Sequence, residues 1–147
     1  MCSAVSPHEK CDGWFDGCGV IVSLHVATGG AAGALTRSRA AALALGPVLH
    51  ALGDAIPHRD IPSRGFETAS GVACALALLV RHGPLSPITI GALAASAPDL
   101  EHVLPRIGGR NLFPSHRFRG WHREGGIPAG PQLVAAGVIL AVLLRRG

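Results

Sequence analysis

The chain has 147 residues, enough for one domain with a core of its own; 48% of them are hydrophobic and only 15% are charged. Typical soluble domains have about 25% charged residues, and the mean hydropathy here is +0.38, so the composition favours a membrane protein or a very apolar bundle. The net charge of +4 is not evidence of nucleic-acid binding. The arginines lie between apolar segments, and they form neither a basic stripe nor a site with aromatic residues on which bases could stack.

The first 19 residues, MCSAVSPHEKCDGWFDGCG, differ from the rest of the chain because they are polar and show no periodicity. They lack the basic-then-apolar order of a signal peptide. We therefore expect a disordered leader at 1–19, followed by a single helical domain at 20–147. If translation starts at Val20 or Val22, the native protein does not contain the leader.

Five apolar segments follow the leader. None alternates with period two, so strands are not expected, and each segment consists of good helix formers. The segments are separated by TRSR, IPHRDIPSRG, RHGPLSP and a long irregular loop that begins at PRIGG. The predicted helices span about 20–35, 40–55, 66–80, 88–104 and 132–144. The predicted fold class is all-α, a bundle of about five apolar helices with a polar site at one end.

These helices are apolar on nearly all sides, which is typical of helices at the centre of a bundle or in lipid. A transmembrane helix needs about 20 apolar residues. The stretches 17–36 and 125–144 carry no charged residue, whereas the second and third segments are shorter. The sequence therefore favours a membrane-embedded or membrane-associated bundle with transmembrane helices, and a soluble five-helix bundle is the alternative.

Histidines and carboxylates gather at one end of the predicted bundle. Short turns make successive helices antiparallel, so the first helix starts where the second ends, and the third, fourth and fifth also meet this end. It receives His25, His50, Asp54, His58, Asp60, Glu67, Asp99, Glu101, His102, His116 and His122. The opposite end receives arginines and one histidine, with no carboxylate.

The spacing of these residues suits a metal site. His50 and Asp54 are four residues apart, and Asp99 and His102 are three apart, so each pair lies on one face of its predicted helix. Two such pairs offer four ligands, as in di-metal carboxylate bundles, and imidazole with carboxylate binds divalent ions. Metal-free acid–base catalysis, salt bridges to neighbouring arginines and a solvated loop end remain alternatives.

Four segments resemble a known family in the same order: LHVATGGAAGAL, HALGDAIPHRD, GALAASAPDLEHVLP and LFPSHRFRGWHR. They are similar to segments of the LexA-regulated, inner-membrane-associated metal-dependent hydrolases, which are distantly similar to the zinc-dependent phospholipase C and P1 nuclease group. The resemblance spans about residues 20–123. It implies ligands at His25, His50, Asp54, His58, Asp99, His102, His116 and His122.

Two features depart from the phospholipase pattern. The gap between Asp54 and His58 is shorter than in that group, and the PD-x-D-H motif reads PDLEH, with Glu101 at its third position. The resemblance to phospholipase C therefore does not define the substrate.

Together, these observations predict a divalent metal, with zinc as first choice. The expected ligands are His25, His50, Asp54, Asp99 and His102. The residues expected to act as general acid or to complete a second metal are His58, His116 and His122. Protein-bound zinc lowers the pKa of its water to about 7, so the expected reaction is hydrolysis of a phosphoester or another ester. The resemblance implies a location at the bacterial inner membrane, with membrane lipid as a partner.

The long loop adds residues with two interpretations each. Arg117, Arg119 and Arg123 are suited to an anionic head group or phosphate of the substrate, or are loop charges that face lipid phosphates. Trp121 is an interfacial anchor or the lid of a small core.

Three other functions compete with hydrolysis. A non-catalytic membrane protein with a structural or sensory metal site is the main alternative. Haem held between His25 and His50 would have carboxylates as unusual neighbours. A serine nucleophile has no support, because the sequence contains no G-x-S-x-G motif.

Overall fold

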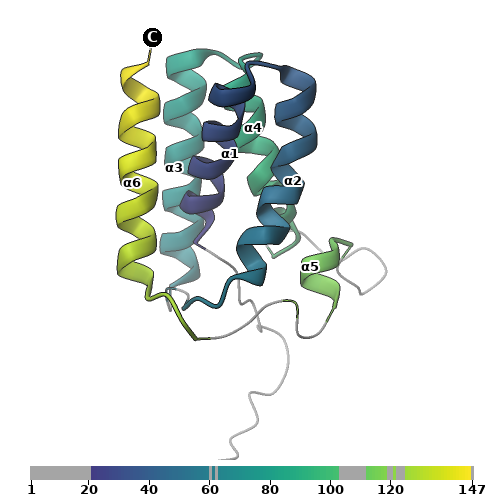
Figure 1. Ribbon diagram of the computed structural model, residues 1–147. Coiled ribbons are helices and arrows are strands. Elements are labelled where there is room, and N and C mark those ends of the chain that lie inside the picture. The colour runs from purple at the N-terminus through teal and green to yellow at the C-terminus, as the bar shows by residue number, and fades with distance from the viewer. Residues whose placement is uncertain are drawn as a thin grey trace, which may run out of the picture.

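The computed structural model describes residues 21–59, 61, 63–102, 112–118, 121 and 125–146, and of Arg64 and His102 it describes the backbone alone. The predicted leader lies outside these residues. The elements are α1 (Val22–Thr36), α2 (Arg39–Ala55), α3 (Arg64–His82), α4 (Pro87–Ser96), the 3-10 helix η1 (Ala97–His102), α5 (Pro114–Arg117) and α6 (Ala129–Arg145). No strand occurs among the described residues, so the all-α prediction is confirmed. Five helices lie side by side, with α5 apart at one end (Figure 1).

Serine residues begin three of these helices. The hydroxyl oxygen of each accepts a hydrogen bond from the backbone N–H three residues later, at 3.1 to 3.4 Å. This bond satisfies one of the amide groups that the first turn of a helix leaves free. The three serines are Ser38 of α2, Ser63 of α3 and Ser86 of α4.

The central helix is α1, which contacts α2, α3, α4 and α6. Glycines let its backbone meet that of α4 directly. A Cβ atom at Gly29 would lie 2.2 Å from the carbonyl oxygen of Gly91, and one at Gly33 would lie 2.0 Å from that of Pro87. At Gly46, α2 approaches α4 equally closely, because a Cβ there would lie 2.5 Å from an alanine Cβ. The small residues of the sequence thus permit close helix–helix packing.

The hydrophobic core lies between α1, α3, α4 and α6. Its buried members are Val26, Ala27, Leu78, Ala92, Ala136, Leu140 and Leu143. Cys74 of α3 is half-buried and packs against this core as a free cysteine. These contacts leave the end of the bundle near α5 to polar side chains.

The fourth predicted helix and the loop after it differ from the prediction. The α-helix ends at Ser96 rather than near residue 104, and the chain continues as η1. Pro98 explains this end, because a proline has no N–H to bond the carbonyl four residues earlier and its ring clashes with it. The loop predicted to be irregular contains the short helix α5.

The two long uncharged stretches give helices shorter than a bilayer requires. The stretch 17–36 contributes the 15-residue α1, and 125–144 contributes the 17-residue α6. Across the described parts of the chain, none of the helices combines the length and the apolar character needed to cross a membrane. The expected transmembrane helix is therefore not found there.

Candidate metal centre

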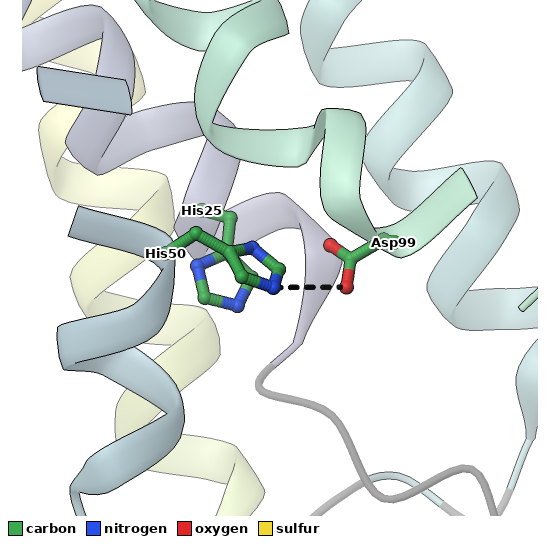
Figure 2. Close-up of side chains that lie close together, drawn as sticks. All are labelled: His25, His50 and Asp99. Atoms are coloured by element: carbon green, nitrogen blue, oxygen red, sulfur yellow. Dashed lines mark ion pairs between the residues drawn. The ribbon is translucent and has the colours of Figure 1, made fainter. Parts of the chain in front are cut away.

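Five side chains from four elements meet at the end of the bundle where α5 lies. They are His25 of α1, His50 and Asp54 of α2, Asp99 of η1 and His116 of α5, and we call them the His/Asp cluster. All five side chains are at most 9% exposed. Figure 2 shows His25, His50 and Asp99 side by side. Four of the five predicted metal ligands are thus brought together; the fifth, His102, ends η1, and its side chain lies outside the described part.

Small residues in the bundle explain why these side chains meet. His25 lies four residues before Gly29, and His50 lies four residues after Gly46, which is about one helical turn in each case. Asp99 lies four residues after the alanine of α4 that Gly29 meets. Because the three helices touch at these small residues, the neighbouring turn brings the three longer side chains into contact.

The position of His50 determines which of its ring nitrogens faces the cluster. Its Nδ1 lies 2.8 Å from the backbone carbonyl oxygen of Ala95. A carbonyl oxygen only accepts, so Nδ1–H donates this bond and the neutral ring keeps its lone pair on Nε2. Nε2 lies 3.7 Å from Asp99 Oδ1, the contact dashed in Figure 2. A histidine held in this way presents the nitrogen that a metal binds.

Three potential ligand atoms form a nearly equilateral triangle. His50 Nε2 lies 3.2 Å from Asp54 Oδ2 and 3.2 Å from His116 Nε2, and the third edge, between His116 Nε2 and Asp54 Oδ2, is 3.5 Å. A tetrahedral zinc ion with bonds of about 2.0–2.1 Å sets its ligands roughly 3.3–3.4 Å apart. The three atoms therefore have the spacing of one face of such a tetrahedron, and the group could hold a metal ion.

A second group with ligand spacing consists of His25, His50 and Asp99. It shares His50 with the first group. Since Nδ1 of His50 is engaged with Ala95, the ring offers one nitrogen, and one nitrogen binds one metal ion. The two groups therefore cannot hold two ions that both bind His50.

Both carboxylate oxygens of Asp54 have polar neighbours. Its Oδ2 accepts a hydrogen bond from the Ser115 hydroxyl, and its Oδ1 lies 3.4 Å from His25 Nε2. Burial alone would raise the pKa of Asp54, but hydrogen bonding with His116 and His25 outweighs it and holds the pKa below its usual range. Asp54 is therefore ionised at neutral pH.

The pKa shifts of Asp99 and His25 both favour the neutral form of the side chain. Burial raises the pKa of Asp99 to about 8; His116 opposes this shift, and the charges of Asp54 and Glu67 add to it. Burial lowers the pKa of His25 to about 4 despite its bond to Asp54. Asp99 Oδ2 is buried and has no hydrogen-bond partner within the described residues. A buried polar atom without a partner is costly, and a bound cation would satisfy it.

Glu101 connects η1 to the start of α5. Its two carboxylate oxygens accept hydrogen bonds from the backbone N–H groups of Phe113, at 2.6 Å, and Leu112, at 2.9 Å. The Phe113 ring then meets the rings of His50 and His116 edge-on, with centroids 5.2 and 5.8 Å away. Neither this role of Glu101 nor the bond from Ser115 was predicted, although Ser115 directly precedes His116 in the sequence.

The predicted general acids have three different outcomes. His116 lies inside the His/Asp cluster, at ligand spacing. His58 is buried, with its Nδ1 hydrogen-bonded to the carbonyl oxygen of Ile56, and it belongs to neither ligand group. His122 lies outside the described residues.

The predicted substrate and lipid contacts are only partly described. Arg117 is exposed on α5 beside His116, while Arg119 and Arg123 lie outside the described residues. Trp121 is 40% exposed, and its Nε1–H donates to the carbonyl oxygen of Ala51 at 2.9 Å. Its indole is thus attached to α2 between His50 and Asp54.

A comparison with protein-family models finds no match, and comparisons with curated proteins and with solved structures find none either. The resemblance to the metal-dependent hydrolases therefore stays a prediction. Any function assigned to this chain depends on the residues of the His/Asp cluster and their geometry.

Proposed function

We propose that this protein is a metal-dependent hydrolase that acts on a phosphoester or another ester. The proposed ion is divalent, with zinc as first choice, and its proposed ligands are His50, Asp54 and His116. The observation that carries the proposal is the triangle of ligand atoms with edges of 3.2, 3.2 and 3.5 Å. Histidine and carboxylate ligands are also typical of catalytic zinc sites, which keep one position open.

The residues around the triangle have supporting roles in this proposal. Ser115 donates a hydrogen bond to Asp54 Oδ2, and His25 Nε2 lies 3.4 Å from Oδ1, so the carboxylate is oriented before an ion binds. Ala95 fixes the ring of His50 through its carbonyl oxygen. When bound, zinc supplies a hydroxide at neutral pH by lowering the pKa of its water to about 7. Arg117, exposed beside His116, is the described arginine that we propose for binding an anionic substrate.

Metal analysis of the purified protein tests the metal-binding part. We expect about one zinc ion per chain in the wild type and none in the double variant His50→Ala/Asp54→Ala. The matched control is His82→Ala, because His82 lies at the opposite end of the bundle and donates to the carbonyl oxygen of Leu143. Zinc at 100 times its Kd should also add about 2.7 kcal/mol to the free energy of unfolding. Equal metal content near zero in wild type and double variant would contradict the proposal.

Hydrolysis is tested separately with chromogenic phosphomonoester, phosphodiester and carboxylic ester substrates. We expect turnover by the zinc-loaded wild type and none by Asp54→Asn, which keeps the shape of the side chain but loses the charge. Circular dichroism of both proteins establishes that the variant is folded.

A structural or sensory metal site is the second candidate function. The burial of all five cluster side chains, none above 9% exposed, favours it, since a closed site needs no path for substrate. Stoichiometric zinc without turnover of any substrate class would support this function over hydrolysis.

We further propose that the protein associates with membrane lipid. The support is apolar surface on the outside of three helices. On α2 it comprises Leu45, Val48 and Leu52, on α3 Val72, Leu76 and Val80, and on α6 Val134, Val138 and Val142. Apolar patches of this extent are uncommon on monomeric soluble proteins.

A further inference from the structure

We propose that Glu101 is a positioning residue of the candidate metal centre: its carboxylate holds the start of α5, so that Ser115 and His116 reach Asp54. The predicted effect on metal binding rests on the proposed function. The tether itself, the two hydrogen bonds that the Glu101 carboxylate accepts from the backbone before α5, is a property of the folded chain.

The contacts of Glu101 are directed at the backbone of the segment that carries His116. Its two oxygens each accept one N–H, from Leu112 and Phe113, the two residues that precede α5. Two and three residues later, Ser115 donates to Asp54 Oδ2 and His116 Nε2 lies 3.5 Å from the same oxygen. One carboxylate on η1 thus sets the position of both contacts to Asp54.

The tether matters because α5 is too short to be stable by itself, although Trp121 also attaches this segment to Ala51 of α2. The helix α5 has four residues, far fewer than a helix needs to be stable by itself. The apolar side chains on either side are exposed, with Leu112 at 62% and Phe118 at 58%. Phe113 is half-buried, and its ring meets His50.

Glu101 acts through the other residues rather than as a ligand. Both of its oxygens are already bonded to backbone N–H groups, and the distance from Oε2 to His116 Nδ1 is 3.9 Å. Glu101 also belongs to neither group of side chains with ligand spacing. The glutamate of the PDLEH motif therefore has the role of holding the α5 segment in place.

A double-mutant cycle of zinc or cobalt affinity tests the proposal on the full-length chain. We expect Glu101→Ala to weaken metal binding about 10- to 100-fold, as loss of a residue that orients ligands does. The double variant Glu101→Ala/His116→Ala should bind no more weakly than His116→Ala alone, because the tether acts through that segment. The visible spectrum of cobalt-loaded Glu101→Ala should resemble that of His116→Ala, and Glu101→Gln, which keeps one good acceptor, should restore part of the affinity.

The matched control is Gln132→Ala. Gln132 is buried and also joins two segments through backbone carbonyls, those of Arg59 and Ile127; within the described part of the chain, none of its hydrogen bonds reaches the His/Asp cluster. Its loss should leave the metal affinity and the cobalt spectrum unchanged. Unchanged affinity in Glu101→Ala, or a double variant weakened by the product of the two single effects, would overturn the proposal.

Hydrogen exchange of the Leu112 and Phe113 amides separates this inference from the proposed function. If the wild type binds no metal, the proposed function fails, yet Glu101→Ala should still exchange these two amides at least tenfold faster than the wild type. Equal exchange rates in the two proteins would overturn the tether whatever the metal result.

Discussion

Asp54 and Asp99 belong to one buried cluster, but their surroundings shift their pKa values in opposite directions. His116, His25 and Ser115 surround the Asp54 carboxylate, so its pKa falls below the usual range in spite of burial. Asp99 has a buried oxygen without a hydrogen-bond partner in the described parts, and burial raises its pKa to about 8. An ionised carboxylate in an apolar setting needs polar partners; Asp54 has the Ser115 hydroxyl on Oδ2 and His25 Nε2 at 3.4 Å from Oδ1, whereas Asp99 has its nearest ion-pair contact at 3.7 Å, with His50.

This difference predicts the pH dependence of the stability of the metal-free protein. Between its ordinary pKa of 3.8 and about 8, Asp99 is protonated in the folded chain but not in the unfolded chain, so its contribution falls as the pH rises. His25, with its pKa lowered to about 4, adds stability only as the pH rises toward 6.5. From pH 6.5 to 8 we therefore expect the free energy of unfolding to fall by roughly 1–2 kcal/mol.

Urea denaturation in the presence of a chelator measures this slope. The variant Asp99→Asn should flatten it, because the amide does not titrate. A wild-type stability that is constant or rises from pH 6.5 to 8, or an equal fall in Asp99→Asn, would be inconsistent with the raised pKa.

Among the helices, the α1–α4 contact explains how the cluster forms. Gly29, Gly33 and Gly91 leave no room for a Cβ atom, so the two backbones lie closer together than larger side chains would allow. His25 precedes this contact by one turn, and Asp99 lies beyond the end of α4. A change in the distance between these helices is therefore expected to move cluster side chains as well.

Substitution of glycines tests the role of this contact. Gly91→Ala places a methyl group 2.2 Å from the carbonyl oxygen of Gly29, and overpacking of this kind destabilises by about 1–3 kcal/mol or more. The matched control is Gly137→Ala in α6, where a Cβ meets nothing within 4 Å. Alanine is a better helix former than glycine, so this variant should gain about 0.5–1 kcal/mol. Thermal unfolding measures both; equal effects of the two substitutions would argue against the close contact.

For the molecule as a whole, large apolar side chains recur on the outer faces of its helices. Val134, Val138 and Val142 repeat every fourth residue on α6 and are 46 to 67% exposed. Val72, Leu76 and Val80 form the same pattern on α3. The hydrophobic effect favours the removal of such stripes from water, which is the physical basis of the proposed association with lipid.

Flotation with phosphatidylethanolamine–phosphatidylglycerol vesicles checks this association. We expect the wild type to float with the vesicles and the triple variant Val134→Ser/Val138→Ser/Val142→Ser to lose most of its binding. Each Å² of apolar side-chain area that is no longer buried in lipid removes about 25 cal/mol of binding free energy. Ala135→Ser/Ala141→Ser, exposed on the same helix, is the control with little change in area. Self-association in solution without any flotation would instead indicate that a second copy of the chain covers these stripes.

The sequence by itself determined the helical fold and the end of the bundle at which the members of the His/Asp cluster meet. Apolar segments without period two, broken by proline and glycine, are sufficient to predict a helical bundle, because those signals are local. The pair His50 and Asp54 was also predictable, since a four-residue spacing places two side chains on one helix face. Topology then predicted that His25 and Asp99 would come to the same end.

The tertiary structure decided the contacts that no local rule contains. His116 was predicted as a general acid or as a ligand of a second metal, and its distances to Asp54 and His50 give it ligand spacing in the same group as those two residues. We propose that Glu101, which accepts hydrogen bonds from the backbone before α5, holds it there. The bond from Ser115 to Asp54 likewise results from packing between distant segments. Spacing along a helix survives folding unchanged, whereas the approach of distant segments is set by which small residues touch and which carboxylate captures which backbone N–H.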